Sequence, residues 1–128
     1  MKKRVLFTAL AVALCVACFS AHAQDHMARI DAGAFEKPTR PPAVFEHDEH
    51  NEKAGIKECA ECHHLYDNGV KLDGESSEDQ RCAECHPLNA SKNTTALRRA
   101  YHLSCRGCHT NREKGPVMCG QCHIKPDR

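Results

Sequence analysis

Four copies of the pattern Cys-x-x-Cys-His occur in this chain, at residues 59–63, 82–86, 105–109 and 119–123. In this pattern, two thiols can form thioether bonds to a haem while the histidine ligates its iron. A single Cys-x-x-Cys pair could instead bind zinc or form a redox disulfide. Four copies favour covalent haem, because zinc ribbons do not need the histidine and structural disulfides usually close longer loops. The predicted attachment residues are Cys59, Cys62, Cys82, Cys85, Cys105, Cys108, Cys119 and Cys122.

The chain has 10 histidines, and eight remain once His22 of the first 23 residues and His26 near the expected new N-terminus are set aside. These eight match the needs of four haem irons. Each iron has two axial positions, so four irons require eight ligands. His63, His86, His109 and His123 close the motifs, and His47, His50, His64 and His102 lie near them. We therefore predict four covalently bound c-type haems (haem c) with two histidines each, which gives lower reduction potentials than a Met/His pair. Met118 could compete at the fourth haem, but it directly precedes a haem-binding cysteine and is badly placed to reach an iron.

The positions of the additional histidines indicate that they tie different haems together. His64 follows His63 directly, and neighbouring side chains point apart, so the two cannot bind one iron. His47 and His50 are three residues apart and would share one face of a helix, so we expect them to serve different irons. His102 lies just before the third motif, which has its own histidine, so it should ligate another haem.

The first 23 residues are typical of a secretory signal peptide. A basic start, Met1–Arg4, is followed by apolar residues 5–19 and by Ala21-His22-Ala23, which predicts cleavage near Ala23 and Gln24. The apolar stretch is shorter than the roughly 20 residues of a spanning helix. We expect a periplasmic domain of residues 24–128, with an uncleaved membrane anchor as the alternative.

The predicted domain has few residues for a hydrophobic core. The chain contains no Trp, 2 Tyr and 4 Phe, and its mean hydropathy is −0.61. A core made from such side chains alone would be marginal at this length. We predict a small, mainly α-helical and irregular fold with short N-terminal strands, in which the four haems form the core.

The signals for secondary structure are short. Residues 24–42 should be extended, as a short strand or a surface wrap, because residues 37–42 are too rich in proline for a helix. Residues 46–50 predict a polar helical turn, and residues 67–77 a surface loop or short hairpin. The strongest helix is expected over residues 93–108, capped by Thr94 or Thr95. Phe45 should pack against a haem near His47 or in an ordinary core.

These motifs resemble class III cytochromes c, the tetrahaem cytochrome c3 family of anaerobic, typically sulfate-reducing bacteria. The resemblance covers residues 45–123. It rests on VFEHDEH, the doubled histidine of CAECHH, AYH before the third motif and the motif order. All motifs here are CxxCH, whereas many type I members carry a CxxxxCH at some haems. The acidic N-terminal half and the strings HDEHNEKAG and KGPVMCGQCH are more similar to the acidic type II cytochrome c3.

The resemblance implies a specific pairing of axial ligands. It pairs His47 with His63, His64 with His86, His50 with His109, and His102 with His123. It also implies an electron carrier, not an enzyme, acting in anaerobic sulfate respiration. The expected partners are periplasmic hydrogenase, a type I cytochrome c3 and a membrane-bound redox complex, with no nucleic acid and no small-molecule substrate.

Two alternatives belong to other functional classes. A multihaem reductase would need an iron with an open position, and the histidine count leaves none. A membrane-anchored tetrahaem protein that oxidises quinol or reduces metals would need a retained N-terminal segment.

Charge is segregated along the sequence. Residues 46–84 contain 12 acidic and 4 basic residues, whereas residues 85–128 contain 2 acidic and 8 basic residues. Without Lys2, Lys3 and Arg4 of the signal peptide, the 18 basic residues fall to 15 against 17 acidic ones, a net charge of −2. We expect this asymmetry to orient encounters with redox partners.

Overall fold

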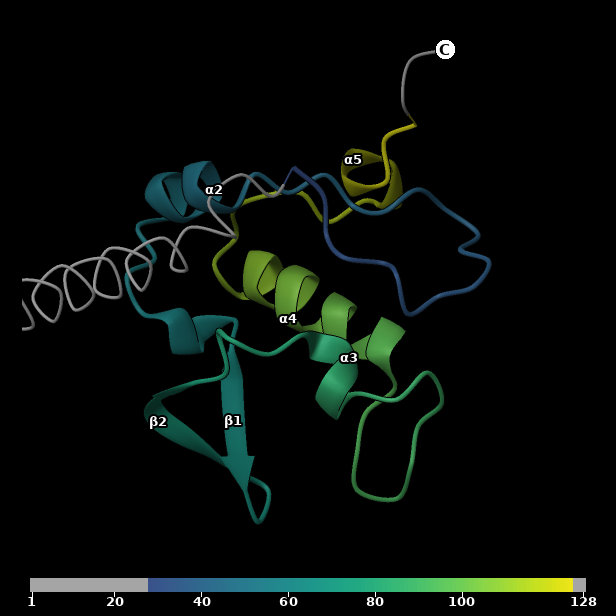
Figure 1. The fold of residues 1–128 in the computed structure, drawn as a ribbon. Helices are drawn as coiled ribbons and strands as arrows, with labels where there is room; N and C mark the ends of the chain where they lie inside the picture. The colour runs from purple at the N-terminus through teal and green to yellow at the C-terminus, as the bar shows by residue number, and fades with distance from the viewer. Residues whose placement is uncertain (1–27, 126–128) are drawn as a thin grey trace, which may run out of the picture.

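The computed structural model describes residues 28–125 (Figure 1). The predicted signal peptide of residues 1–23, its cleavage site and His26 lie outside the described residues. Among the helices of residues 28–125, none has the length and apolar character needed to cross a membrane.

Short elements follow one another along the chain and carry the four motifs. They are α2 (His47–Ala54), the 3-10 helix η2 (Cys59–Glu61), β1 (His64–Asp67), β2 (Val70–Ser76), α3 (Cys82–Cys85), α4 (Leu97–Asn111) and α5 (Cys119–Cys122). Each Cys-x-x-Cys pair begins on a helical turn, in η2, α3, the last part of α4, or α5. Residues three apart on such a turn lie on one side of it. The local structure therefore turns both thiols of a motif in a similar direction.

The predicted loop or hairpin over residues 67–77 is a hairpin. β1 and β2 form an antiparallel two-stranded sheet in which Asp67 pairs with Val70. Between them, Asn68 and Gly69 have φ angles of 47° and 82°. Two successive residues with positive φ are typical of the tight turn that Asn-Gly favours between antiparallel strands. This turn signal determines where the chain reverses.

The N-terminal segment is extended, but it forms no regular strand within the described residues. Arg29 and Val44 form an isolated antiparallel bridge, flanked by hydrogen bonds from Ile30 N to Ala43 O and from Phe45 N to Ala28 O, both 3.0 Å. Of the short N-terminal strands that were predicted, the described residues form only this one bridge. Prolines at positions 38, 41 and 42 interrupt a longer ladder, because proline has no N–H to donate. We call residues 28–44 the N-terminal strap.

The long helix α4 is present, but its predicted limits were wrong. It begins at Leu97 with Ala96 as its extended N-cap, and it ends at Asn111. The expected caps, Thr94 and Thr95, lie in the preceding loop, where Ser91 N donates to Thr94 O at 3.0 Å. Leu97 N instead donates to Pro87 O at 2.7 Å, so a carbonyl from the second motif region fixes the start of the helix.

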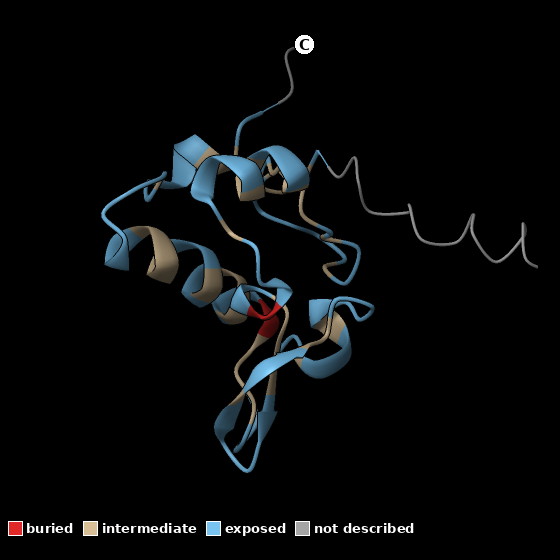
Figure 2. Ribbon diagram, turned by 90° about the vertical axis from the view of Figure 1, so that its left-hand side faces the viewer, coloured by how far each residue is buried: buried red, intermediate tan, exposed pale blue. Residues whose placement is uncertain are grey.

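Hydrophobic packing between side chains is sparse. Within residues 28–125, only Ala60 and Leu97 are buried (Figure 2). Ala60 lies inside the first motif and Leu97 begins α4. Because burial of apolar surface is the main favourable contribution to folding, side-chain packing alone contributes little to holding these short elements together.

Candidate haem sites

Each motif histidine faces one of the four additional histidines. The ring centroids are 6.4 Å apart for His47 and His63, 5.9 Å for His64 and His86, 6.0 Å for His50 and His109, and 6.3 Å for His102 and His123. These are the pairs that the family resemblance implies. Two imidazoles on one metal, each bonded at about 2 Å through a ring nitrogen, have centroids about 6 Å apart. The spacing of all four pairs therefore fits an iron between the rings, although ligation itself stays a prediction.

Helix α2 directs its two histidines toward different motifs. His47 faces the first motif and His50 faces the third, as expected if they serve separate irons. The ring of Phe45 lies 5.9 Å from the ring of His47 and 4.9 Å from that of His50. Phe45 is therefore packed against both histidines. The helix ends at Ala54 and is followed by Gly55, whose φ of 66° is the left-handed conformation that glycine adopts readily at a helix C-terminus.

Three motif histidines are oriented by backbone carbonyl groups. Nδ1 of His86 lies 3.0 Å from Thr95 O, Nδ1 of His109 lies 2.7 Å from Pro116 O, and Nδ1 of His123 lies 2.6 Å from Pro41 O. A carbonyl oxygen can only accept, so each Nδ1 carries the proton and donates. Nε2 then offers its lone pair, which is the form that binds a metal. The sequence motifs give no sign of these carbonyls, because their positions depend on the backbone path.

The first site is arranged differently. No hydrogen bond from the His63 side chain occurs among residues 28–125. On the opposite ring, Nδ1 of His47 lies 2.8 Å from Oδ1 of Asp48, an exposed carboxylate. Asn51 contacts Nε2 of His47 at 3.4 Å, which is long for a hydrogen bond and therefore weak. The polar contact that fixes the first pair thus comes from a side chain on α2.

The eight motif cysteines are unpaired thiols in this structure. Partial desolvation, reinforced by neighbouring thiols, raises the pKa of Cys105 to about 11. Desolvation also raises the pKa of Cys62. Catalytic redox cysteines instead have lowered pKa values, because their thiolate must be present near neutral pH. These two thiols therefore do not have the character of a disulfide-exchange site.

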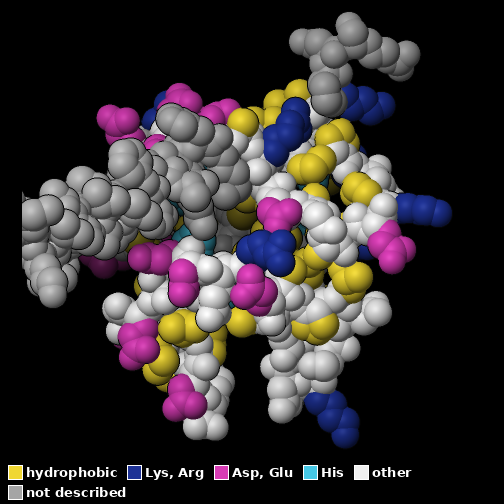
Figure 3. All heavy atoms as spheres, viewed as in Figure 1, with side chains coloured by type: hydrophobic (Ala, Val, Ile, Leu, Met, Phe, Trp, Pro, Cys, Tyr) yellow, Lys and Arg dark blue, Asp and Glu magenta, His cyan; other side chains and the backbone are white. Residues whose placement is uncertain are grey.

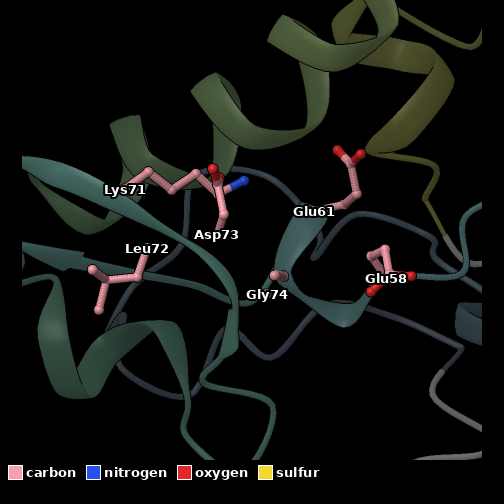
Figure 4. Close-up of a pocket in the computed structure, with 7 residues that line it drawn as sticks. Glu58, Glu61, Lys71, Leu72, Asp73 and Gly74 are labelled. Carbon is pink, nitrogen blue, oxygen red and sulfur yellow. The ribbon is translucent and has the colours of Figure 1, made fainter.

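A shallow hollow of about 170 Å³ lies between the first motif and β2 (Figure 4). Glu58 and Glu61 lie on one side, and Lys71 and Asp73 of β2 on the other. Pockets for organic ligands are usually about 300–1,000 Å³ and mostly apolar. This small charged hollow is therefore not a cofactor site, and the four histidine pairs lie elsewhere.

Charge is also unevenly distributed over the folded chain. In the view of Figure 3, acidic side chains gather mainly over α2, the first motif and the hairpin, and basic side chains lie mainly over the remainder. One ion pair joins the basic part of the sequence to the acidic part, because Arg112 lies 3.5 Å from Glu61. A second ion pair connects two distant segments, since Arg81 lies 3.9 Å from Asp31.

Comparison with known proteins places the chain in a family. The family described as the class III cytochrome C family matches residues 23–123. A cytochrome c3 from Desulfovibrio desulfuricans is 31% identical over 106 residues, which cover 79% of this chain and 94% of that protein. A high-molecular-weight cytochrome c from Nitratidesulfovibrio vulgaris is 39% identical over 74 residues, which cover 52% of this chain and 13% of that protein. A cytochrome c7 from Geobacter metallireducens is 54% identical over 24 residues, 19% of this chain and 27% of that protein.

The chain therefore belongs to the class III cytochrome c family. Proteins of this family carry covalently bound c-type haem and are electron carriers, not enzymes. The predicted family is confirmed, and the reductase alternative is rejected.

Proposed function

We propose that this protein carries four c-type haems, each ligated by two histidines, and transfers electrons at low potential. The observation that carries the proposal is the set of four histidine pairs, each with a motif histidine and a ring spacing of about 6 Å. Each haem, when bound, supplies a one-electron redox centre whose potential is lowered by histidine at both axial positions. The cysteines of the four motifs would form the thioether bonds, and the eight paired histidines would hold the irons.

The polypeptide joins these sites through short connections. His63 and His64 are adjacent in sequence and face histidines of the first and second sites. Helix α2 contributes a histidine to each of the first and third sites, and α4 carries His102 for the fourth site together with the third motif. The covalent chain therefore links the sites in the order second, first, third and fourth. Such direct connections keep the sites close, which favours electron exchange between neighbours.

Four haems would also supply the apolar surface that the chain lacks. Only Ala60 and Leu97 are buried within the described residues, so little hydrophobic stabilisation comes from the side chains themselves. Covalent attachment at eight cysteines would place the porphyrin faces among the short elements. In this proposal the haems form the core and the polypeptide wraps around them.

The protein acts in the periplasm, after removal of residues 1–23, and relays electrons in anaerobic sulfate respiration. Its partners are periplasmic hydrogenase or a type I cytochrome c3 on one side and a membrane-bound redox complex on the other. The similarity of several strings to type II cytochrome c3 and the segregation of charge support this proposal. The membrane-anchored protein that oxidises quinol or reduces metals remains the second candidate, favoured only if the apolar residues 5–19 are retained.

Mass spectrometry and carbon monoxide binding test the proposal on the exported protein. We expect a chain that begins near Gln24 with four attached haems, low-spin spectra and almost no carbon monoxide binding after reduction. Saturation by eight histidines is the reason, because no iron has an open position. Fewer than four haems, or rapid stoichiometric binding of carbon monoxide, would contradict it. A retained Met1 would instead support the anchored alternative.

A further inference from the structure

We propose that Arg29 is a positioning residue for the fourth haem site. It holds the N-terminal strap so that the carbonyl of Pro41 keeps its hydrogen bond to His123, and it thereby lowers the reduction potential of that haem. The inference rests on the proposed function, because it concerns the haem that His102 and His123 would ligate.

Arg29 connects the strap to the residues around the fourth motif. Its Nη1 lies 2.8 Å from Pro42 O and 3.3 Å from Ile124 O, so one guanidinium group bridges two carbonyls 82 residues apart in sequence. On one side of this bridge, Val44 N donates to Cys122 O at 2.9 Å. On the other side, His123 Nδ1 donates to Pro41 O at 2.6 Å. The contact of Arg29 is thus part of a cluster that fixes the strap against the fourth motif.

Backbone hydrogen bonds around Arg29 fix the position from which its side chain extends. Hydrogen bonds formed by Ile30 and Phe45 flank the bridge between Arg29 and Val44. The far part of the strap is attached separately, because the Tyr101 hydroxyl donates to Asp31 O at 3.0 Å. Loss of the guanidinium group should therefore loosen the strap near Pro41 without releasing the whole strap.

The fourth site depends on such a clamp more than the second and third sites do. His86 and His109 donate to carbonyls 9 and 7 residues away, so a short loop fixes each acceptor. The acceptor of His123 is 82 residues away. An imidazole that donates from Nδ1 is a more basic metal ligand at Nε2. Greater basicity favours the ferric iron, so this hydrogen bond lowers the potential.

The direction of the change separates this role from a simple effect of charge. A positive charge near a haem stabilises the reduced form, which carries one more electron than the oxidised form. Removing that charge would therefore lower the reduction potential. Weakening the hydrogen bond between His123 and Pro41 would raise it. The two explanations for an effect of Arg29 therefore predict shifts of opposite sign.

The test is a redox titration of the exported, haem-loaded protein, in which NMR signals resolved for each of the four haems report how far each one is reduced. In the Arg29→Ala variant we expect the reduction equilibrium of the haem ligated by His123 to change roughly tenfold toward the reduced form, a rise of about 59 mV for one electron. The Nδ1 proton of His123 should also exchange faster with solvent. Arg40→Ala is the matched control, because Arg40 is an exposed strap arginine without a hydrogen bond or ion pair among the described residues.

A fall in that potential, no change in it, or an equal change at all four haems would overturn the inference. A rise confined to this haem in Arg29→Ala but absent from Arg40→Ala would support it. Failure of the proposed function looks different: the unmodified protein itself would lack a fourth haem or a low-spin fourth iron. If the unmodified protein has four attached low-spin haems and Arg29→Ala leaves the potential of the fourth haem unchanged, only the role of Arg29 is rejected and the proposed function stands.

Discussion

The first and fourth sites reach nearly the same geometry by different routes. The ring centroids are 6.4 Å apart in the pair of His47 and His63, and 6.3 Å apart in the pair of His102 and His123. The first pair comes from one short stretch, residues 47–63, which contains α2 and η2. The fourth pair needs α4, α5 and the N-terminal strap, which are distant in sequence. A common ligand spacing can therefore depend on local structure at one site and on tertiary structure at another.

The two sites also differ in the groups that surround them. At the first site the polar partner is the Asp48 carboxylate, which belongs to the acidic helix α2. At the fourth site the partner is a neutral carbonyl, and Arg29 lies close by. A carboxylate that accepts from Nδ1 makes an imidazole a stronger donor to metal than a carbonyl does. We therefore expect the first haem to have the lower potential of the two.

The largest effect should come from removing one ligand at each of these sites. His102→Ala should leave four haems attached, because no cysteine is changed, while one iron loses its sixth ligand, becomes high-spin and binds carbon monoxide. His47→Ala is the matched variant and should do the same at the first haem. Visible and electron paramagnetic resonance spectra measure the fraction of high-spin iron, expected near one quarter in each variant. An unchanged low-spin spectrum for His102→Ala would mean that this exposed histidine is not a ligand.

The same contrast explains what could be predicted from the sequence. The motifs predicted the attachment cysteines and motif histidines because c-type haem attachment depends on a five-residue pattern. The turn residues of 67–77 predicted a surface loop or a short hairpin, and the hairpin formed because the backbone preference of Asn68-Gly69 is local. The start of α4 at Leu97 could not be predicted in this way, because its amide hydrogen bond goes to Pro87 O, ten residues earlier.

Long-range contacts were likewise hidden from the sequence patterns. The bond between His123 and Pro41 and the bridge formed by Arg29 join opposite ends of the described chain. A proline-rich stretch indicated an extended segment, but it gave no information about which motif that segment would contact. Similarly, the pairing of histidines came from family resemblance, because spacing alone required only that certain histidines serve different irons.

An intermediate effect is expected on association with redox partners. Glu46 and Glu49 are exposed beside the first site, and Arg98 and Arg99 are exposed at the start of α4. Replacing both glutamates by lysine, which reverses their charge, should slow electron exchange with a basic cytochrome about tenfold at low salt. Replacing both arginines by glutamate should slow exchange with an acidic partner to a similar extent. Stopped-flow rates should lose most of this difference above about 0.15 M salt, where the Debye length is about 8 Å.

Each pair of substitutions serves as the control for the other. If both pairs slowed exchange with both partners equally, the charge separation along the sequence would not act as two docking surfaces. The first and fourth sites would then differ in construction but not in the partners they meet.

The smallest effect should follow from breaking the ion pair between Glu61 and Arg112. The nearest charged atoms are 3.5 Å apart, and the side chains remain 47% and 43% exposed. Such exposed pairs stabilise proteins by at most about 1 kcal/mol, because water screens them and two flexible side chains must be ordered. Glu61→Gln should therefore lower the urea midpoint of the haem-loaded protein by less than about 1 M, given slopes of about 1–3 kcal/mol/M. Glu58→Gln is the control, since it removes a nearby exposed carboxylate that forms no ion pair within residues 28–125. A loss of several kcal/mol in Glu61→Gln alone would show that the first site also depends on a distant segment, and the contrast between local and tertiary construction would fail.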